Sequence, residues 1–263
     1  MATEYLTNDI ELTSVADAIR AKSGQTGQLI YPDGFASAVA GIKKAPTTPY
    51  MVAEYEQEPM TAYESAIYIK KAKLYNHTRI AAYEIAYQHL LQELDMSDPS
   101  NNITTIDANA FTYSMCENVI IPETVTLIGN SAFSSANIGT MILPGSVTRI
   151  SAFAFQGVRG VNGVAPVIKL NEGLAVIDQS AFNSASIAGE IEIPSTVTEI
   201  GAYCFAYTGI TTVICKPTTP PAIESSAFSS DTAGFTIKVP AASVAAYKAA
   251  TNWSSYADYI VGV

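Results

Sequence analysis

The sequence is poor in charge, and most of the charge it has is negative. Only 14% of its 263 residues are charged, and 14 Lys and Arg stand against 24 Asp and Glu, a formal net charge of -10. This balance argues against nucleic acid or an anionic membrane surface as partner, because both attract basic proteins. No apolar run approaches the ~18 residues that span a bilayer, so membrane insertion is not expected. Hydrophobic residues still make up 48% of the chain, which predicts a folded protein.

Cysteine and histidine, which often carry chemistry, are also scarce. The cysteines Cys116, Cys204 and Cys215 fit neither a disulfide framework nor the paired spacing of a zinc site. The histidines His77 and His89 lie 12 residues apart, outside any metal or nucleophile motif. We therefore expect no catalytic residue, no metal site, no cofactor and no enzymatic activity, and we interpret Cys116 and Cys204 as core residues.

What the chain does contain is a repeat of 22 to 27 residues between residues 103 and 240. In each unit an Ile is followed five residues later by a Phe, and a small residue precedes that Phe. The six Phe residues are Phe111, Phe133, Phe155, Phe182, Phe205 and Phe228, at spacings of 22, 22, 27, 23 and 23. A unit of this length cannot bury its own apolar face, so successive units must stack into a solenoid with a continuous core.

A short apolar run closed by proline follows most of these Phe residues, as in Val119–Pro122. Alternating residues in such a run predict a short strand, and the proline ends it. In the third unit Asn171 replaces the proline. The residues one and three positions before the proline are expected to point inward, and the residue between them outward. In the fifth unit this rule places Ile214 inward and Cys215 outward.

The outward residues of these strands form the candidate binding surface. One residue from each unit contributes to this ladder: Ile120, Ile142, Lys169, Glu192, Cys215 and Lys238. Solenoids often use such a face for recognition, and two exposed Ile residues in neighbouring coils call for a cover. That cover is either a ligand, the N-terminal module or a neighbouring copy, so a homo-oligomer stays open. Glu190 and Glu192 share one face, but no acid-base partner or calcium loop accompanies them, which favours a solvated face.

The units, of the form T-x-I-x-x-x-A-F … I-P-x-x-V, resemble the BspA-like leucine-rich repeats of bacterial surface proteins. The resemblance covers six consecutive units over residues 103–240. It implies an α/β leucine-rich-repeat solenoid of short stacked strands with turns and short helices, which binds a protein or glycan. Residues 239–258, around Trp253, resemble the helical cap that ends such arrays. No Asn column repeats, so the usual internal amide ladder is not expected.

A separate small module is expected before the array. Residues 14–22 and 35–42 predict two short helices on either side of the turn Tyr31-Pro32-Asp33-Gly34. This segment resembles part of the tail-associated structural proteins of phages and prophages of Gram-positive bacteria. The first twelve residues do not resemble a secretory signal. The resemblance implies that the protein stays in the cytoplasm until it is released with a virion, and is then extracellular, on a cell surface or on the particle.

These observations predict five segments and two functions. The segments are a small N-terminal helical module at 1–45, a linker at 46–59, a degenerate cap or first coil at 60–102, six repeats at 103–240 and a C-terminal cap at 241–263. The favoured function is a non-enzymatic binding or adhesion module that recognises a protein or glycan. The alternative is an assembly protein whose solenoid is a spacer and whose N-terminal module docks or oligomerises. The insertion Gly157–Gly163 is interpreted as a surface loop, with ligand contact as the alternative.

Overall fold

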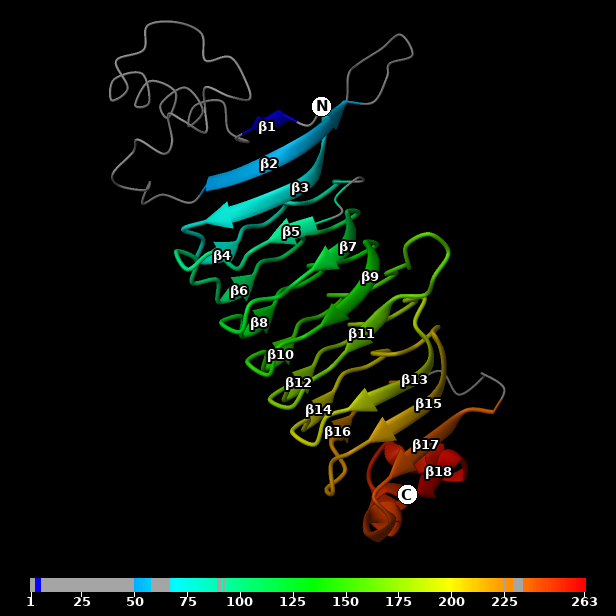
Figure 1. The fold of residues 1–263 in the computed structure, drawn as a ribbon. Helices are drawn as coiled ribbons and strands as arrows, with labels where there is room; N and C mark the ends of the chain where they lie inside the picture. Colours follow the sequence, from blue (N-terminus) through cyan, green and yellow to red (C-terminus); the bar gives the residue numbers. More distant parts are fainter. Residues whose placement is uncertain are drawn as a thin grey trace, which may run out of the picture.

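The structure is a computed structural model that describes residues 3–5, 50–57, 67–88, 91, 93–224, 226–228 and 234–263. In these residues the chain forms an elongated solenoid whose coils stack in sequence order (Figure 1). The two helices expected in the N-terminal module lie outside the described residues, as does His89. The N-terminal module therefore stays a prediction.

One side of the solenoid is a continuous parallel ladder of two-residue strands, which we call the turn ladder. Its strands are β4 (Arg79–Ile80), β6 (Thr105–Ile106), β8 (Leu127–Ile128), β10 (Arg149–Ile150), β12 (Val176–Ile177), β14 (Glu199–Ile200) and β16 (Ala222–Ile223). The Ile at the end of each strand pairs with its counterpart in the next coil and is buried.

The longer strands stack on the other side of the solenoid (Figure 1). They are β3 (Ile67–Tyr75), β5 (Glu93–Asp95), β7 (Met115–Val119), β9 (Asn137–Ile142), β11 (Val167–Lys169), β13 (Ala188–Ile193), β15 (Gly209–Cys215), β17 (Thr236–Val239) and β18 (Ile260–Gly262). From β3 onward these strands pair in parallel, but they divide into two sheets between β11 and β13.

A column of stacked Phe rings fills the core between the two sides. From Phe111 to Phe228 the ring centroids of successive coils lie 4.6 to 5.7 Å apart, and their planes differ by no more than 11°. Each buried Phe side chain contributes roughly 1.5–3 kcal/mol to folding, and ring stacking adds about 0.5–1.5 kcal/mol. The small residue before each Phe is buried as well. In the second to sixth units its backbone carbonyl accepts from the Phe N–H of the preceding coil, and in the first unit Ala110 accepts from the Ile85 N–H. The predicted solenoid of stacked strands is confirmed, but the described coils contain turns in place of the expected short helices, so the repeats are β rather than α/β.

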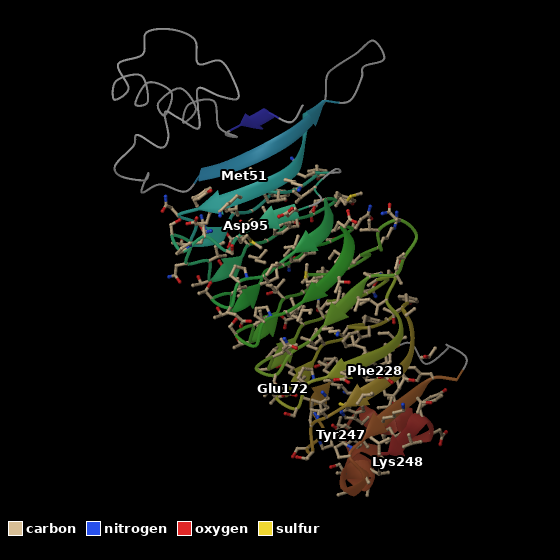
Figure 2. All side chains as sticks on the ribbon, viewed as in Figure 1. Met51, Asp95, Glu172, Phe228, Tyr247 and Lys248 are labelled. Carbon is tan, nitrogen blue, oxygen red and sulfur yellow. The ribbon has the colours of Figure 1, made fainter. Side chains whose placement is uncertain are left out.

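The N-terminal end of the array differs from the expectation for residues 46–59. Residues 50–57 of this expected linker form strand β2 (Tyr50–Gln57), which pairs antiparallel with β3 and with β1 (Thr3–Tyr5). The run from Tyr50 to Tyr55 is rich in residues that favour strands, and the proline pair just before it hid this signal. Met51 is buried opposite Leu74, so β2 closes the first coil (Figure 2).

The C-terminal end is covered by short helices and a last strand. These are η1 (Ala241–Ser243), α3 (Val244–Ala249) and η2 (Trp253–Tyr259), followed by β18. Trp253 is fully buried and its Nε1 donates to the Pro221 carbonyl at 2.7 Å. The rings of Trp253 and Tyr256 lie 5.9 and 5.6 Å from that of Phe228. Figure 2 shows Phe228 beside this helical segment, which therefore packs on the last ring of the Phe column.

Candidate functional site

The outward side of the longer strands, which we call the strand face, carries an apolar patch. Ile120 is 79% exposed and Ile142 is 53% exposed. Asn118 pairs with Thr140, which sets Ile120 beside Ile142 in the next coil. Val167 lies opposite Thr140 and is 46% exposed. The patch of Ile120, Ile142 and Val167 therefore crosses three successive coils at the surface.

The strand face is charged on the C-terminal side of this patch. Lys169 lies opposite Ile142 in the ladder and is exposed. Further along, the Glu192 carboxylate is 2.6 Å from the Lys216 ammonium, and this hydrogen bond raises the Lys216 pKa. Glu190 pairs with Lys238 at 3.6 Å. Such exposed ion pairs add little stability. Their main effect is that a lysine compensates the negative charge of each carboxylate. Their arrangement gives no sign of the acid-base pair considered for Glu190 and Glu192.

Cys215 does not belong to the strand face, and its predicted outward position is wrong. Cys215 is 1% exposed, and the outward residue of the fifth coil is Ile214, which lies between Glu192 and Lys238. In the fourth coil the last inward residue directly precedes the proline, whereas in the fifth coil Lys216 stands between Cys215 and Pro217. The count from the proline was thus one residue off, and a slip of one residue exchanges the two faces of a strand.

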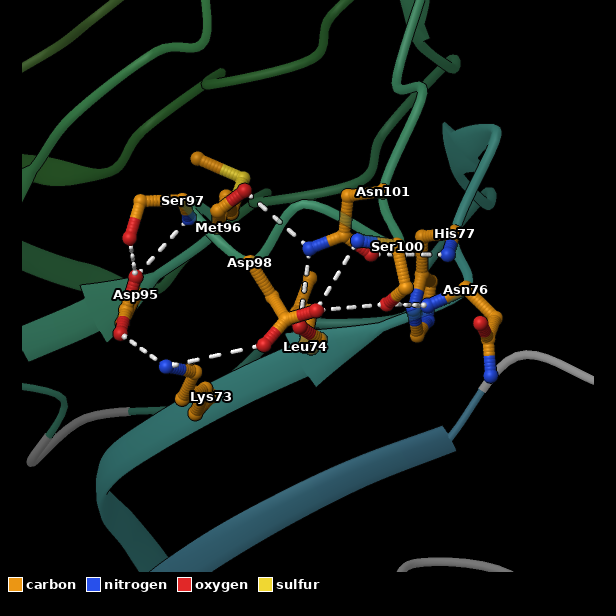
Figure 3. A network of polar contacts seen from close by, with 10 residues as sticks. All are labelled: Lys73, Leu74, Asn76, His77, Asp95, Met96, Ser97, Asp98, Ser100 and Asn101. Atoms are coloured by element: carbon orange, nitrogen blue, oxygen red, sulfur yellow. Dashed lines mark hydrogen bonds and ion pairs between the residues drawn. The ribbon is translucent and has the colours of Figure 1, made fainter. Parts of the chain in front are cut away.

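The N-terminal side of the patch also carries charged residues, and these form ion pairs with each other. Lys71 pairs with Glu93 at 3.2 Å. In Figure 3 the Lys73 ammonium lies between Asp95 and Asp98, at 3.3 and 3.8 Å. The hydroxyl and backbone N–H of Ser97 donate to Asp95 and hold the pKa of that carboxyl below its usual value. The apolar patch is therefore bordered by ion pairs on its N-terminal side, and on its C-terminal side by Lys169 and, beyond it, by the ion pairs of Glu190 and Glu192.

His77 is part of a network that joins the first two coils. Its Nδ1 lies 2.9 Å from the Tyr75 carbonyl and its Nε2 lies 2.8 Å from Glu84. The His77 backbone N–H donates to the Asn101 side chain, whose Nδ2 in turn donates to the carbonyls of Leu74 and Met96 (Figure 3). His77 is 4% exposed, so its surroundings indicate a role in holding the coils together.

The third repeat interrupts the strand side of the solenoid. Its extra residues form a small hairpin in which Val161 and Val164 make an antiparallel bridge closed by Asn162 and Gly163, both with positive φ. The strand that follows, β11, is only three residues long and no ladder pairs it with β13. A cleft of about 340 Å³ opens between the two strands and is lined by residues 166–171, 187–188 and 190–192.

Side chains join the third and fourth coils just after the C-terminal ends of β11 and β13. At this point Asn171 stands where most other repeats have a proline. Glu172 accepts from the hydroxyl and the backbone N–H of Ser195, at 2.8 and 3.2 Å, and these bonds lower the Glu172 pKa. The Gly173 N–H donates to the Thr196 hydroxyl at 3.0 Å. The Asn171 amide donates back to the Leu143 carbonyl. Hydrogen bonds of the Glu172, Ser195 and Thr196 side chains thus join the third and fourth coils where the strand ladder is missing.

Exposed tyrosines are a further feature, one that the sequence analysis did not single out. Residues two before and two after the Phe column adopt positive φ in coil after coil, a backbone that Ser, Asn and Gly take more readily than Tyr. Tyr83, Tyr87, Tyr113 and Tyr203 occupy such positions and are about half exposed. The rings of Tyr87 and Tyr113 stack 5.5 Å apart. Their signal in the sequence is a Tyr two residues from an Ala-Phe or equivalent pair.

The described side chains offer few reactive groups. Burial raises the pKa of the Cys204 thiol well above its usual value and that of Cys215 to about 12, so both thiols stay protonated at neutral pH. Both sit in the core, as expected for Cys204 and contrary to the outward position predicted for Cys215. The described residues contain no group of three His, Cys, Asp or Glu side chains placed to hold a metal ion.

Comparison with known proteins identifies the repeats. A model of the BspA type leucine rich repeat region, in six copies, matches residues 59–162 and 164–249. No curated protein matches the chain. None of the helices in the described residues is both long and apolar enough to cross a membrane. The repeat columns, the stacked coils and a match over more than two thirds of the sequence show that the chain belongs to the BspA-type leucine-rich repeat family.

Proposed function

We propose that the chain is a non-enzymatic binding module that recognises a protein or a glycan through its strand face. Leucine-rich repeats commonly mediate protein binding or adhesion. The observation that carries the proposal is the apolar patch, because Ile120 and Ile142 lie side by side and largely exposed. Contiguous exposed apolar side chains mark interaction sites more often than free surface. Most charges on the described strand face are paired with each other, and the patch is the part of the face where large apolar side chains are exposed.

The proposed setting is a cell surface or the surface of a virion. Proteins with BspA-type repeats are often surface-associated. A phage-tail origin is supported by the resemblance of the N-terminal segment alone. The assembly function rests on the same segment, residues 1–45, nearly all of which lies outside the described residues.

The test is a binding screen with variants of the patch. The purified full chain is passed over immobilised glycans, bacterial cell-wall fractions and extracellular-matrix proteins, and every saturable signal is repeated with the Ile120→Lys/Ile142→Lys double variant. Thr126→Lys/Thr148→Lys is the matched control, because these two residues are also exposed, also 22 residues apart and lie next to the turn ladder. Light scattering on the same samples gives the oligomeric state.

The proposal expects at least one ligand whose affinity falls tenfold or more in the Ile120/Ile142 variant, a loss of about 1.4 kcal/mol. The Thr126/Thr148 variant should bind as the wild type does. Equal binding by all three proteins would reject the strand face as the binding surface. A chain without residues 1–45 should keep its ligand. If it instead loses a discrete oligomer and no ligand is found, the assembly function replaces the proposal.

A further inference from the structure

The cleft between β11 and β13 leaves two sheet edges facing each other inside one solenoid. No ladder joins these two strands, whereas paired strands lie about 4.8 Å apart. An opening that admits one additional strand needs roughly twice the strand spacing, about 9.6 Å. The missing ladder and the cavity of about 340 Å³ between the two strands suit a short stretch of one extended polypeptide.

The register shows which backbone groups line this opening. In the neighbouring coils the N–H of the inward residue Leu143 donates forward to the Lys169 carbonyl, and the carbonyl of the inward residue Ile193 accepts from Lys216 of the next coil. Inward residues therefore point their backbone groups to the following coil, and outward residues point theirs to the preceding coil. By this alternation Ile168 faces β13 and Glu192 faces β11, across the cleft.

Hydrogen bonds join the third and fourth coils at both ends of the cleft and behind it. Before the N-terminal ends of the two strands the Ser186 N–H donates to the Val158 carbonyl at 2.8 Å. After their C-terminal ends Glu172 accepts from Ser195. Behind the cleft the turn ladder is intact, because Val176 still pairs with Glu199. The coils therefore separate on the strand face only, so the cleft is a built feature of the third repeat and its inserted hairpin.

The chemistry of the two edges selects the occupant. Unpaired strand edges offer donors and acceptors at the two-residue spacing that another peptide backbone satisfies, which is how proteins bind partners by strand addition. The inner wall is apolar, with Ile168 and Ile191 both buried. Lys169 is exposed at the rim and makes no ion pair among the described residues. A peptide that fits the cleft therefore has apolar and acidic residues in alternation. Its apolar side chains point toward Ile168 and Ile191, and an acidic side chain lies beside Lys169.

We propose that this cleft accepts one extended segment of a partner protein, of alternating apolar and acidic residues, as an added strand between β11 and β13. The inference rests on the proposed binding function, and it names the class of partner and places the segment next to the apolar patch. Val167 belongs to both surfaces, so a partner whose segment enters the cleft also reaches Ile142.

The test uses the full chain and an immobilised set of ten-residue peptides. One group alternates apolar and acidic residues, and a second group has the same composition in scrambled order. Glu192→Pro removes the backbone N–H that faces the cleft and leaves the β13–β15 ladder partners of Ile191 and Ile193 in place. Glu192→Ala is its matched control, because it loses the same carboxylate and the Lys216 ion pair but keeps the N–H. Circular dichroism verifies that each variant is folded.

A second pair of variants tests the rim charge without touching the backbone. Lys169→Glu reverses the charge beside the cleft, and Lys248→Glu makes the same change on α3, at the C-terminal end of the molecule (Figure 2). This pair keeps the proposal testable if Glu192→Pro does not fold. Amide hydrogen exchange with and without the best peptide then locates the bound segment.

The proposal expects the alternating peptides to bind and the scrambled ones to bind at least tenfold more weakly. Glu192→Pro and Lys169→Glu should each lower the affinity tenfold or more, while Glu192→Ala and Lys248→Glu change it less than threefold. Bound peptide should slow amide exchange in β11 and β13. The inference is overturned by peptides that bind without protecting these strands, by no binding at all, or by protection that depends on protein concentration alone and so reveals a second copy in the cleft. If the Ile120/Ile142 variant still abolishes a hit from the screen, the proposed function survives that failure.

Discussion

The two sides of the solenoid behave differently when the repeat length changes. On the turn ladder every coil presents the same Ile in the same register, from Ile80 to Ile223, and the 27-residue third repeat leaves no gap. On the strand side that same repeat shortens β11, adds a hairpin and opens a cleft before β13. The core columns therefore fix the stacking of the coils, and the strand face is where length and side chains are free to vary.

This difference separates the residues that stabilise the fold from those of the proposed binding surface. The Phe column and the turn ladder hold the buried groups that make folding favourable, whereas the strand face mixes exposed Ile, paired charges and an open edge. Substitutions in the Phe column and the turn ladder should therefore have large effects on stability, and substitutions on the exposed strand face should have small ones.

The largest effect is expected in the middle of the Phe column. Phe155→Ala removes a fully buried ring that stacks on both neighbours, and it should lower the free energy of unfolding by about 3–5 kcal/mol. Chemical denaturation measures the loss. Phe153→Ala is the control, since Phe153 lies two residues away and is only partly buried, and it should cost less than half as much. Equal losses would show that the column does not dominate the core.

The next effect concerns the network that joins the first coils. Asn101→Ala leaves the His77 N–H and the carbonyls of Leu74 and Met96 without this partner, which should cost about 1–3 kcal/mol. Asn102→Ala, at the exposed neighbour, serves as control. Amide exchange should show faster opening of residues 71–101 in the first variant alone. Unchanged exchange there would mean that the network does not hold the N-terminal coils.

A smaller, pH-dependent effect is expected below the cleft. Ser195 lowers the pKa of Glu172 in the folded chain, so the carboxylate stabilises the fold above its unfolded pKa, and that contribution is lost as the pH falls through the lowered folded value. Glu172 is exposed to solvent, so the effect is small. Denaturation of the wild type and Glu172→Gln from pH 6 to pH 3 should give stabilities that converge at low pH. A constant difference across this range would contradict the assignment.

The smallest effect is expected on the strand face. Ile120→Thr changes an exposed side chain and should alter the free energy of unfolding by no more than about 0.5 kcal/mol. Ile121→Ala, one residue further and buried, should cost about 2–5 kcal/mol. Thermal denaturation of the two variants compares the inward and outward positions directly. A large loss in Ile120→Thr would mean that the patch is covered within the chain.

The sequence predicted the repeat columns, because buried Ile and Phe recur at fixed spacing and burial has a visible period. It predicted the outward positions of Ile120, Ile142, Lys169, Glu192 and Lys238, but it misplaced Cys215, because a proline marks where a strand ends without fixing its register. The strand β2 was missed next to Pro46 and Pro49. Each of these errors lies where pairing with a neighbouring strand decides the outcome.

The cleft could not be predicted from the sequence for a related reason. The third repeat was visibly longer and lacked its proline, but residues 167–170 keep the alternation of an ordinary strand. Whether β11 pairs with β13 depends on how the insertion is accommodated, and hydrophobic pattern carries no information on that. The tyrosines at positive φ were also missed, because Ser, Asn and Gly mark such a backbone more readily than Tyr does.

The most direct test of this account is amide hydrogen exchange on the unliganded full chain, resolved by coil. The account predicts slow exchange along the whole turn ladder, including Val176 and Glu199, and on the strand side a local loss of protection at Ile168 and Glu192, where the two sheet edges face the cleft. Protection of Ile168 and Glu192 equal to that of Met141 and Val213, which lie in paired strands, would contradict it and show that the strand ladder runs unbroken.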